Sequence, residues 1–306
     1  MLLKVLGTAA GGGVPQWNCA CPGCAGARAH PERRRRHASL AVRADDGQWF
    51  LINATPDIAD QIEATPQLHP GPAARRTPVR GLILTDAELD HTLGLARLRE
   101  ADRVDVLATA PVRRALCERL HLADVLGPYT DLTWRELGPD PVPLTGTDTG
   151  TGTGIEISAL PVSAKRPRYA ADSPAADAED PTWVIALRLH DPATGGTAVY
   201  APCLSTWPPG LDAALADADC VLLDGTFWDD DEPHRSGFST RSATAMGHLP
   251  IDGPHGTARR LAPLRARCLY THLNNTNPLT DPGAPQHGHL AARGLAVAVE
   301  GMEIAL

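Results

Sequence analysis

Short apolar runs separated by polar, glycine- and proline-containing turns divide the chain into many small elements. Runs of roughly four to eight aliphatic and β-branched residues, bounded by turn residues, are typical of β-strands. In chain order, strands are predicted at Leu2–Leu6, Ser39–Arg43, Gln48–Asn53, Leu82–Thr85, Val104–Ala108, Ile155–Val162, Trp183–His190, Thr197–Ala201, Cys220–Asp224, Cys268–Thr271 and Ala296–Val299. Helices are predicted at Thr109–Leu122, at Gly210–Ala218, and from Ser239 or Thr240 to Met246.

Hairpin-like strands come first in each half of the chain, and strands that alternate with helices follow them. Ser39–Arg43 and Gln48–Asn53 flank Asp45-Asp-Gly47, which is a strong hairpin-turn signal. This order favours an α/β fold in which two mixed sheets pack together with helices on the outer faces, an αββα sandwich. Because no linker interrupts the pattern, residues 1–306 are predicted to form a single domain.

Composition narrows the class of protein. Hydrophobic residues make up 43% of the 306 residues and charged residues 21%, which is ordinary for a globular domain. The net charge of −8 argues against a nucleic-acid partner. No stretch approaches the roughly 20 apolar residues of a membrane span, and no secretion signal precedes the first strand, so we expect a cytoplasmic protein without a membrane partner. The oligomeric state is left open, a homodimer included.

The stretch Leu82–Leu95 holds the densest group of candidate metal ligands. An apolar run ends at Thr85, and four such residues follow at once: Asp86, Glu88, Asp90 and His91. Chemistry placed at the carboxyl end of a strand, on a loop that leads to a helix, is a common way to build an active site. The stretch therefore predicts a metal-dependent site.

A second group of ligands lies near the amino terminus. Cys19, Cys21 and Cys24 form a Cys-x-Cys-x-x-Cys pattern on a predicted tight loop. Three thiolates on one loop, in a chain without a secretion signal, favour a structural zinc site, with free buried thiols as the alternative. Tetrahedral zinc needs a fourth ligand, for which His30 and His37 are in reach by sequence.

Four consecutive arginines, Arg33–Arg36, follow this pattern. A short basic run in an acidic chain predicts a solvated surface, and contact with substrate or nucleic acid is the alternative.

The loop after Thr85 resembles the metal-binding loop of the metallo-β-lactamase superfamily, His-x-His-x-Asp-His. Aligned on Asp90-His91, the first two histidines fall at Asp86 and Glu88. By the same resemblance, the third histidine falls near Ser163, and the aspartate that bridges two metals falls near Cys203. The resemblance implies the αββα fold and a first metal position that has lost its histidines.

Several segments together resemble a more specific family, the B proteins of pyrroloquinoline quinone biosynthesis. These segments are Gly11–Cys19, Asn53–Ile58, Asp90–Leu95, Leu223–Trp228, Thr240-Arg241 with Met246–Leu249, and His272–Pro278. They span nearly the whole chain. The resemblance implies oxidative tailoring of a Glu-Tyr unit cut from a precursor peptide, in which the tyrosine ring is hydroxylated.

The resemblance implies that Asp90, His91 and His272 hold one metal ion. Two imidazoles and one carboxylate with open positions are the ligand set of non-haem iron(II) oxygenases, so iron, dioxygen and a small peptide substrate are expected. The alternatives are a metal-dependent phosphodiesterase or hydrolase of the same fold, and a non-catalytic carrier in transport of the quinone or its precursor.

Four further residues receive roles as hypotheses. Asp224 is an additional ligand or orients one; His248 is a proton donor, a substrate contact or a helix-terminal histidine satisfied by backbone; and Arg241 pairs with a substrate carboxylate. In related phosphodiesterases the fourth zinc ligand is a histidine three residues after the late metal histidine. That position is Asn275 here, which makes the asparagine the candidate fourth zinc ligand.

Overall fold

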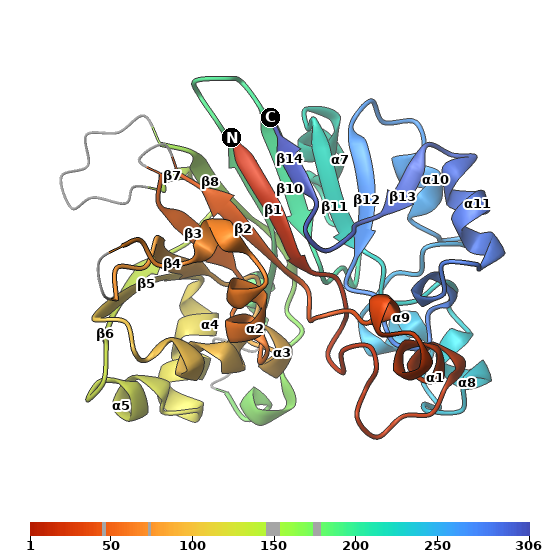
Figure 1. Ribbon diagram of the computed structural model, residues 1–306. Coiled ribbons are helices and arrows are strands. Elements are labelled where there is room, and N and C mark those ends of the chain that lie inside the picture. The colour runs from red at the N-terminus through yellow and green to blue at the C-terminus, as the bar shows by residue number, and fades with distance from the viewer. Residues whose placement is uncertain (45–46, 73–74, 145–153, 174–178) are drawn as a thin grey trace. The chain divides into compact units, whose positions relative to one another are not determined.

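The computed structural model describes residues 1–44, 47–72, 75–144, 154–173 and 179–306. The chain divides into two compact units. Unit 1 contains residues 1–6, 39–197 and 301–306, and unit 2 contains residues 7–38 and 198–300. Figure 1 shows β1 and β14, from the two ends of the chain, side by side. The prediction that residues 1–306 form a single domain stays a prediction.

The first sheet belongs to unit 1 and has seven strands in the order β14-β1-β2-β3-β4-β5-β6. Their bounds are β1 Leu2–Gly7, β2 Ser39–Arg43, β3 Trp49–Ile52, β4 Val79–Ile83, β5 Arg103–Ala108, β6 Asp131–Glu136 and β14 Glu303–Ala305. The predicted hairpin is confirmed, since β2 and β3 pair antiparallel with Leu40 opposite Ile52. Asp45 and Asp46 of its predicted turn lie outside the described residues. Strands β3 to β6 pair in parallel.

Unit 1 contains nine short helices within the described residues. They are α2 Ile58–Glu63, η2 Pro66–Leu68, α3 Leu89–Thr92, η3 Leu93–Leu98, α4 Ala110–Arg114, the π-helical η4 Ala115–Arg119, α5 Leu122–Leu126, η5 Arg168–Ala170 and η6 Pro181–Trp183. Seven follow β3, β4 and β5, and the last two, η5 and η6, lie between the antiparallel strands β8 (Glu156–Ser163) and β9 (Val184–His190). The single helix predicted at Thr109–Leu122 is therefore wrong in its outline. His121 adopts a left-handed backbone (φ 51°), which ends one helical run and begins the next.

The second seven-stranded sheet has the order β13-β12-β11-β10-β9-β8-β7. Three of its strands belong to unit 1: β7 Val142–Pro143, β8 Glu156–Ser163 and β9 Val184–His190. Strand β10 Thr197–Ala201 begins at the boundary between the units. The other three belong to unit 2: β11 Cys220–Asp224, β12 Arg267–Thr271 and β13 Leu295–Val297. Strands β10 to β13 pair in parallel. Helices α7 Leu211–Ala216, α10 Ala258–Leu261 and α11 Pro285–Ala291 supply the crossovers that parallel neighbours require (Figure 1).

The remaining short elements of unit 2 are α1 Pro22–Ala29, η1 Pro31–Arg33, α8 Glu232–Arg235, α9 Ala243–Met246 and η7 Pro278–Thr280. Helix α9 begins later than predicted because Ser242, rather than Ser239 or Thr240, accepts a hydrogen bond from the Ala245 amide. Gly247, with φ 94°, ends it. Within the described ranges, no helix is long and apolar enough to cross a bilayer.

Two sequence predictions in unit 2 are corrected. The cysteine segment is not a loop throughout, because Cys21 occupies the N-cap of α1 and Pro22 its first turn. The solvated-surface prediction for Arg33–Arg36 fails for Arg35, whose guanidinium lies largely buried and donates to the Thr8 hydroxyl at 3.0 Å. Arg36 pairs with Glu300 at 3.1 Å.

Candidate metal centre

His91 is held by a buried carboxylate in unit 1. It lies on the short helix α3, after strand β4, and is fully buried. Its Nδ1 lies 2.7 Å from Asp86 Oδ2, and Asp86 also accepts hydrogen bonds from the Thr85 hydroxyl (2.8 Å) and the Glu88 amide (2.9 Å). Burial lowers the pKa of His91, but the charges of Asp86 and Asp90 outweigh it and raise the pKa to about 9. Because Nδ1 is committed to Asp86, Nε2 is the ring nitrogen that can bind a metal.

Asp90 lies beside the metal-binding edge of His91. Its Oδ2 is 3.8 Å from His91 Nε2, a separation at which both atoms can reach one ion. Glu88, the other acidic residue of the loop, is half-buried, and burial together with the charge of Asp86 raises its pKa. The loop is fixed from outside by Tyr169, whose hydroxyl donates to the Ala87 carbonyl at 2.6 Å.

Asp224 lies at the end of β11 in unit 2 and is saturated with hydrogen bonds. Its Oδ1 accepts from the Thr226 amide (2.9 Å) and hydroxyl (2.6 Å). Its Oδ2 accepts from the Leu204 amide (2.7 Å) and from His248 Nδ1 (2.7 Å). Burial alone would raise the pKa of Asp224, but His248 and these donors hold it below its usual value. With all four acceptor positions in use, the contacts favour the orienting role over the ligand role.

The Thr226 hydroxyl links Asp224 to the second histidine of the group. Since it gives its one hydrogen to Asp224, it accepts the Nδ1–H of His272 at 2.8 Å. His248 and His272 stack with ring centroids 5.6 Å apart and an interplanar angle of 21°. Both rings therefore present Nε2 on the edge that faces away from Thr226. We call Asp224, Thr226, His248 and His272 the His–Asp cluster.

His272 carries two further marks of a functional position. Its backbone is left-handed, with φ 59°, although it is buried and is not a glycine. Such strained residues cluster at functional sites. Its Nε2 lies 3.8 Å from Cys203 Sγ, so a thiol occupies the place at which the superfamily resemblance expects a bridging carboxylate.

The His–Asp cluster offers imidazole nitrogens to a metal ion. Asp224, His248 and His272 are buried and lie together, with one oxygen or nitrogen atom of each within 4.8 Å of the others. Because Asp224 and both Nδ1 atoms are committed to hydrogen bonds, an ion would be held through imidazole Nε2, a ligand that suits zinc and iron. The ligand set predicted from the sequence, Asp90, His91 and His272, stays a prediction.

Arg241 is not brought to this cluster by any of its hydrogen bonds within the described residues. It is exposed, its guanidinium donates to the Ala245 carbonyl, and its amide donates to the Ser239 hydroxyl at 3.0 Å. With His234 and Phe238 it lines an open depression on unit 2. Its assignment to a substrate carboxylate stays a prediction.

The three cysteines of unit 2 converge as the sequence pattern predicts. The Cys19, Cys21 and Cys24 sulfurs lie within 4.8 Å of one another, and we call them the cysteine cluster. Asn275 Nδ2 lies 3.2 Å from Cys19 Sγ and 3.3 Å from Cys21 Sγ. Neither His30 nor His37 is part of this group, although both were in reach by sequence.

Three positioning residues were not predicted from the sequence. The sequence indicates Asp86 as a candidate metal ligand and as a replaced histidine, whereas in the structure it orients His91. Thr226 was part of a quoted motif without a role, and its one signal is its place two residues after Asp224. Arg28 supports the cysteine segment through hydrogen bonds to the Cys19 (2.5 Å) and Gln16 (2.7 Å) carbonyls, a role visible only once α1 is folded.

The fold and the buried histidine–carboxylate groups define a class of protein. The model of the β-lactamase superfamily domain matches residues 48–273. A diphosphatase of the PhnP family shares the fold, with a TM-score of 0.69 and 19% identity over 100% of this chain and 97% of that one. The chain is a member of the metallo-β-lactamase superfamily.

Closer relatives define the family within that class. Coenzyme PQQ synthesis protein B of Azoarcus sp. (strain BH72) is 43% identical over 100% of both chains, and that of Cupriavidus taiwanensis 42% over 99% of both. The crystal structure of Zn(2+)-bound PqqB from Methylobacterium extorquens matches with a TM-score of 0.87 and 31% identity over 100% of both chains. This chain belongs to the coenzyme PQQ synthesis protein B family.

Proposed function

We propose that the chain is a mononuclear iron, dioxygen-dependent hydroxylase that acts on the tyrosine of a Glu-Tyr-derived peptide precursor in coenzyme PQQ biosynthesis. Its relatives are named for synthesis of that coenzyme, and the family resemblance of the sequence motifs implies the substrate class. The assignment of a single metal ion is supported by the contacts of Asp86, whose carboxylate oxygens are already used by other groups. Two hydrogen bonds and the contact with His91 occupy a carboxylate that stands where a two-metal enzyme has a histidine.

The proposed ligands are Asp90, His91 and His272, joined by sequence resemblance. When bound, an iron(II) ion of this ligand type offers open positions for dioxygen and substrate. Neighbouring residues hold the two histidine ligands in the tautomer that can bind a metal. Asp86 fixes the tautomer of His91, and Thr226 fixes that of His272, so that each imidazole presents Nε2.

His248 is the proposed proton-transfer residue. Its Nδ1–H is held by Asp224 at 2.7 Å, and its Nε2 is the atom at which it accepts a proton and returns it. The edge of its ring meets Phe227, with centroids 6.0 Å apart, which restricts rotation. The ring thus has a fixed orientation and one basic nitrogen.

The test is reconstitution with iron(II) under anaerobic conditions, followed by oxygen-uptake and mass measurements with a Glu-Tyr dipeptide and longer tyrosine-containing peptides. The expected product has gained one oxygen atom on the tyrosine ring, and the zinc form is inactive. His272→Ala is expected to abolish the reaction, while His255→Ala, at an exposed histidine of unit 2, retains it. Phosphodiester cleavage by a form with two ions at the active site would overturn the proposal.

A second candidate function is metal-dependent hydrolysis of a phosphoester. The Asp224–His248 pair favours it, because a histidine held by a carboxylate can also protonate a leaving oxygen. The same metal-loaded preparations assayed with a chromogenic phosphodiester decide between the two. A carrier role would gain support only if the chain bound the quinone tightly and neither reaction were found.

A further inference from the structure

The cysteine cluster has no fourth ligand of the usual kinds among the residues the structure describes. The cluster is limited to Cys19, Cys21 and Cys24, and no His, Asp, Glu or further Cys joins it within 4.8 Å. Cys24 is buried, whereas Cys19 and Cys21 are each partly exposed. Three thiolates fit zinc, which takes four ligands in a tetrahedral site. Among the described residues Asn275 contacts two of these sulfurs, which leaves Asn275 and an external molecule as the candidate fourth donors.

The side chain of Asn275 presents hydrogen-bond donors to the cluster, and its backbone carbonyl accepts a hydrogen bond from the Cys21 thiol at 3.3 Å. Its Nδ2 lies within hydrogen-bond distance of two sulfurs, at 3.2 Å from Cys19 and 3.3 Å from Cys21. An amide nitrogen has no lone pair for a metal, but its two hydrogens can each stabilise one thiolate. The backbone of Asn275 is fixed against α1, since a Cβ at Gly23 would lie 2.2 Å from its carbonyl oxygen. The Asn275 side chain therefore supports two sulfurs through its amide hydrogens, while its carbonyl oxygen is already engaged by Cys21 and packed against α1.

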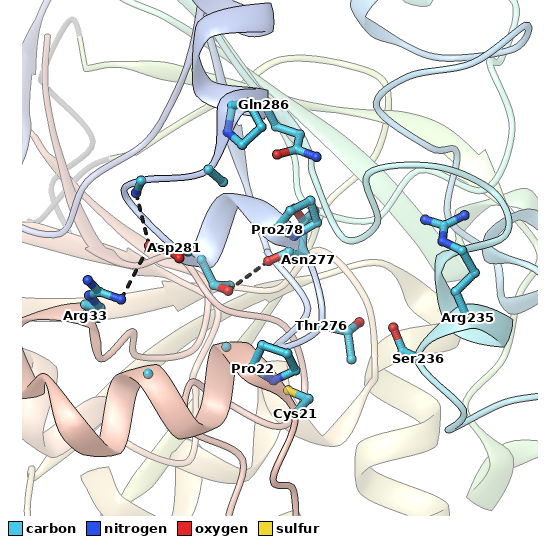
Figure 2. A pocket seen from close by; sticks show the side chains of 16 residues that line it. Cys21, Pro22, Arg33, Arg235, Ser236, Thr276, Asn277, Pro278, Asp281 and Gln286 are labelled. Carbon is cyan, nitrogen blue, oxygen red and sulfur yellow. Dashed lines mark hydrogen bonds and ion pairs between the residues drawn. The ribbon is translucent and has the colours of Figure 1, made fainter.

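A cavity of about 670 Å³ opens beside the cluster, with Cys21 in its wall. Figure 2 shows Cys21 and Pro22 on one side, with Arg33 and Arg235 on two others. Arg33 pairs with Asp281 at 3.3 Å, and the rest of the wall combines polar side chains with prolines, glycines and an alanine. The volume is in the range of sites that bind small molecules. All of these residues belong to unit 2.

We propose that the metal of the cysteine cluster keeps its fourth coordination position open to this cavity, where water is exchanged for the thiolate of a small molecule. The ligand class follows from the donors, because a site of three thiolates favours a further soft sulfur ligand. Arg33 and Arg235 in the cavity wall are each already paired, with Asp281 at 3.3 Å and with Asp229 at 2.6 Å, so the ligand class follows from the sulfur donors alone. This inference does not depend on the hydroxylase proposal.

The test uses the full chain loaded with cobalt(II), whose thiolate charge-transfer absorption counts bound sulfurs. Addition of 2-mercaptoethanol is expected to raise this absorption by about one third, since three sulfurs become four. In Asn275→His the new imidazole fills the fourth position, so the rise is lost while cobalt remains bound. In Asn275→Ala both the cobalt and the rise are retained.

Controls separate the cluster from the other thiols of the chain. Cys203→Ala is expected to respond like the unchanged protein, because Cys203 is not part of the cluster. Far-ultraviolet circular dichroism verifies that each variant is folded. An absorption that does not change on addition of thiol would overturn the proposal. Release of cobalt in Asn275→Ala but not in Asn275→Asp would also overturn it, because it would identify Asn275 as the fourth ligand.

Discussion

A single hydroxyl, that of Thr226, joins the carboxylate and both imidazoles of the His–Asp cluster. It lies 2.6 Å from Asp224 Oδ1, 2.8 Å from His272 Nδ1 and 3.0 Å from His248 Nδ1. Hydrogen bonds of this kind fix the tautomer and the ring orientation of a metal-binding histidine. The contribution of the Thr226 hydroxyl to metal binding can be measured with valine, which has nearly the same shape as threonine but no hydroxyl.

Thr226→Val is expected to lower the affinity for iron(II) by about 10- to 100-fold, since His272 Nδ1–H loses its acceptor and the ring is free to turn. Competition with a chromogenic chelator measures the affinity. Thr226→Ser, which restores the hydroxyl, should recover most of it. Equal iron(II) affinity in the valine variant and the unchanged protein would show that Thr226 does not orient the metal-binding histidine.

Glu232 gives unit 2 a pH-dependent stability. Its carboxylate is buried and accepts hydrogen bonds from the Trp228 amide (2.6 Å) and the Thr276 hydroxyl (2.7 Å). Burial nevertheless raises the pKa of Glu232 from 4.5 to about 7. A raised pKa means that the folded state holds the proton more tightly than the unfolded state, so this stability is present below pH 4.5 and is lost as the pH rises towards 7.

The loss is up to about 3 kcal/mol, at about 1.4 kcal/mol for each pH unit between the two pKa values. Glu232→Gln should remove this part of the pH dependence because the amide does not titrate. Urea unfolding of both proteins at about pH 5 and about pH 8 measures the difference. Parallel pH profiles for the two proteins would show that Glu232 does not titrate in this range.

Sequence motifs predicted which residue types gather at each site better than they predicted what each residue does. The cysteine cluster and the contact of Asn275 with it follow from spacing and from family resemblance. The roles of Asp86 and Thr226 could not be predicted, because they depend on side-chain directions that exist only after β4 and β11 are folded. Asp86 is the clearest case, since the sequence indicates a candidate ligand at the position of a replaced histidine and gives no sign of its contact with His91.

At the scale of elements, burial decided which strands could be predicted. Strands β10 and β11 were predicted to the residue, because parallel strands covered on both faces are continuous apolar runs. Strand β6 was missed because its sequence, Asp-Leu-Thr-Trp-Arg-Glu, is only half-buried at the edge of its sheet. Strand β14 was missed because it has three residues and forms the opposite edge.

Helix α1 offers a matched pair of glycines for testing how the cysteine segment is fixed to residues 275–280. A Cβ at Gly23 would lie 2.2 Å from the Asn275 carbonyl oxygen and 2.7 Å from Thr280 Oγ1, whereas one at Gly26 meets nothing closer than 3.5 Å. Gly23→Ala is therefore expected to destabilise the chain by about 3 kcal/mol and to weaken zinc retention at the cysteine cluster.

Gly26→Ala should be neutral or stabilise the protein by up to about 1 kcal/mol, because alanine is the better helix former. Urea unfolding and zinc retention during dialysis measure both variants. Similar behaviour of the two would mean that close contact between α1 and Asn275 does not hold the cysteine segment.

At the scale of the whole molecule, each unit contributes its own histidine held by a carboxylate. Unit 1 has His91 with Asp86, and unit 2 has His248 with Asp224. Superfamily membership was predictable from motifs spread along the chain and is confirmed by the match over residues 48–273. The division into two compact units was not, because unit 1 contains both chain ends and no linker marks the boundary.

The metal content of the chain tests the assignment of one ion to the cysteine cluster and one to the histidines. We expect about two ions in each fully loaded chain, one at the cysteine cluster and one bound by histidine, because Asp86 is committed to His91 and leaves a second active-site ion without its ligand. His272→Ala should lose the histidine-bound ion alone, and Cys24→Ser should lose the cysteine-bound ion alone. His255→Ala should retain both. Elemental analysis of the purified variants counts the ions, and a third ion that is lost together with the second in His272→Ala would show that the active site is binuclear and that Asp86 is free to bind metal.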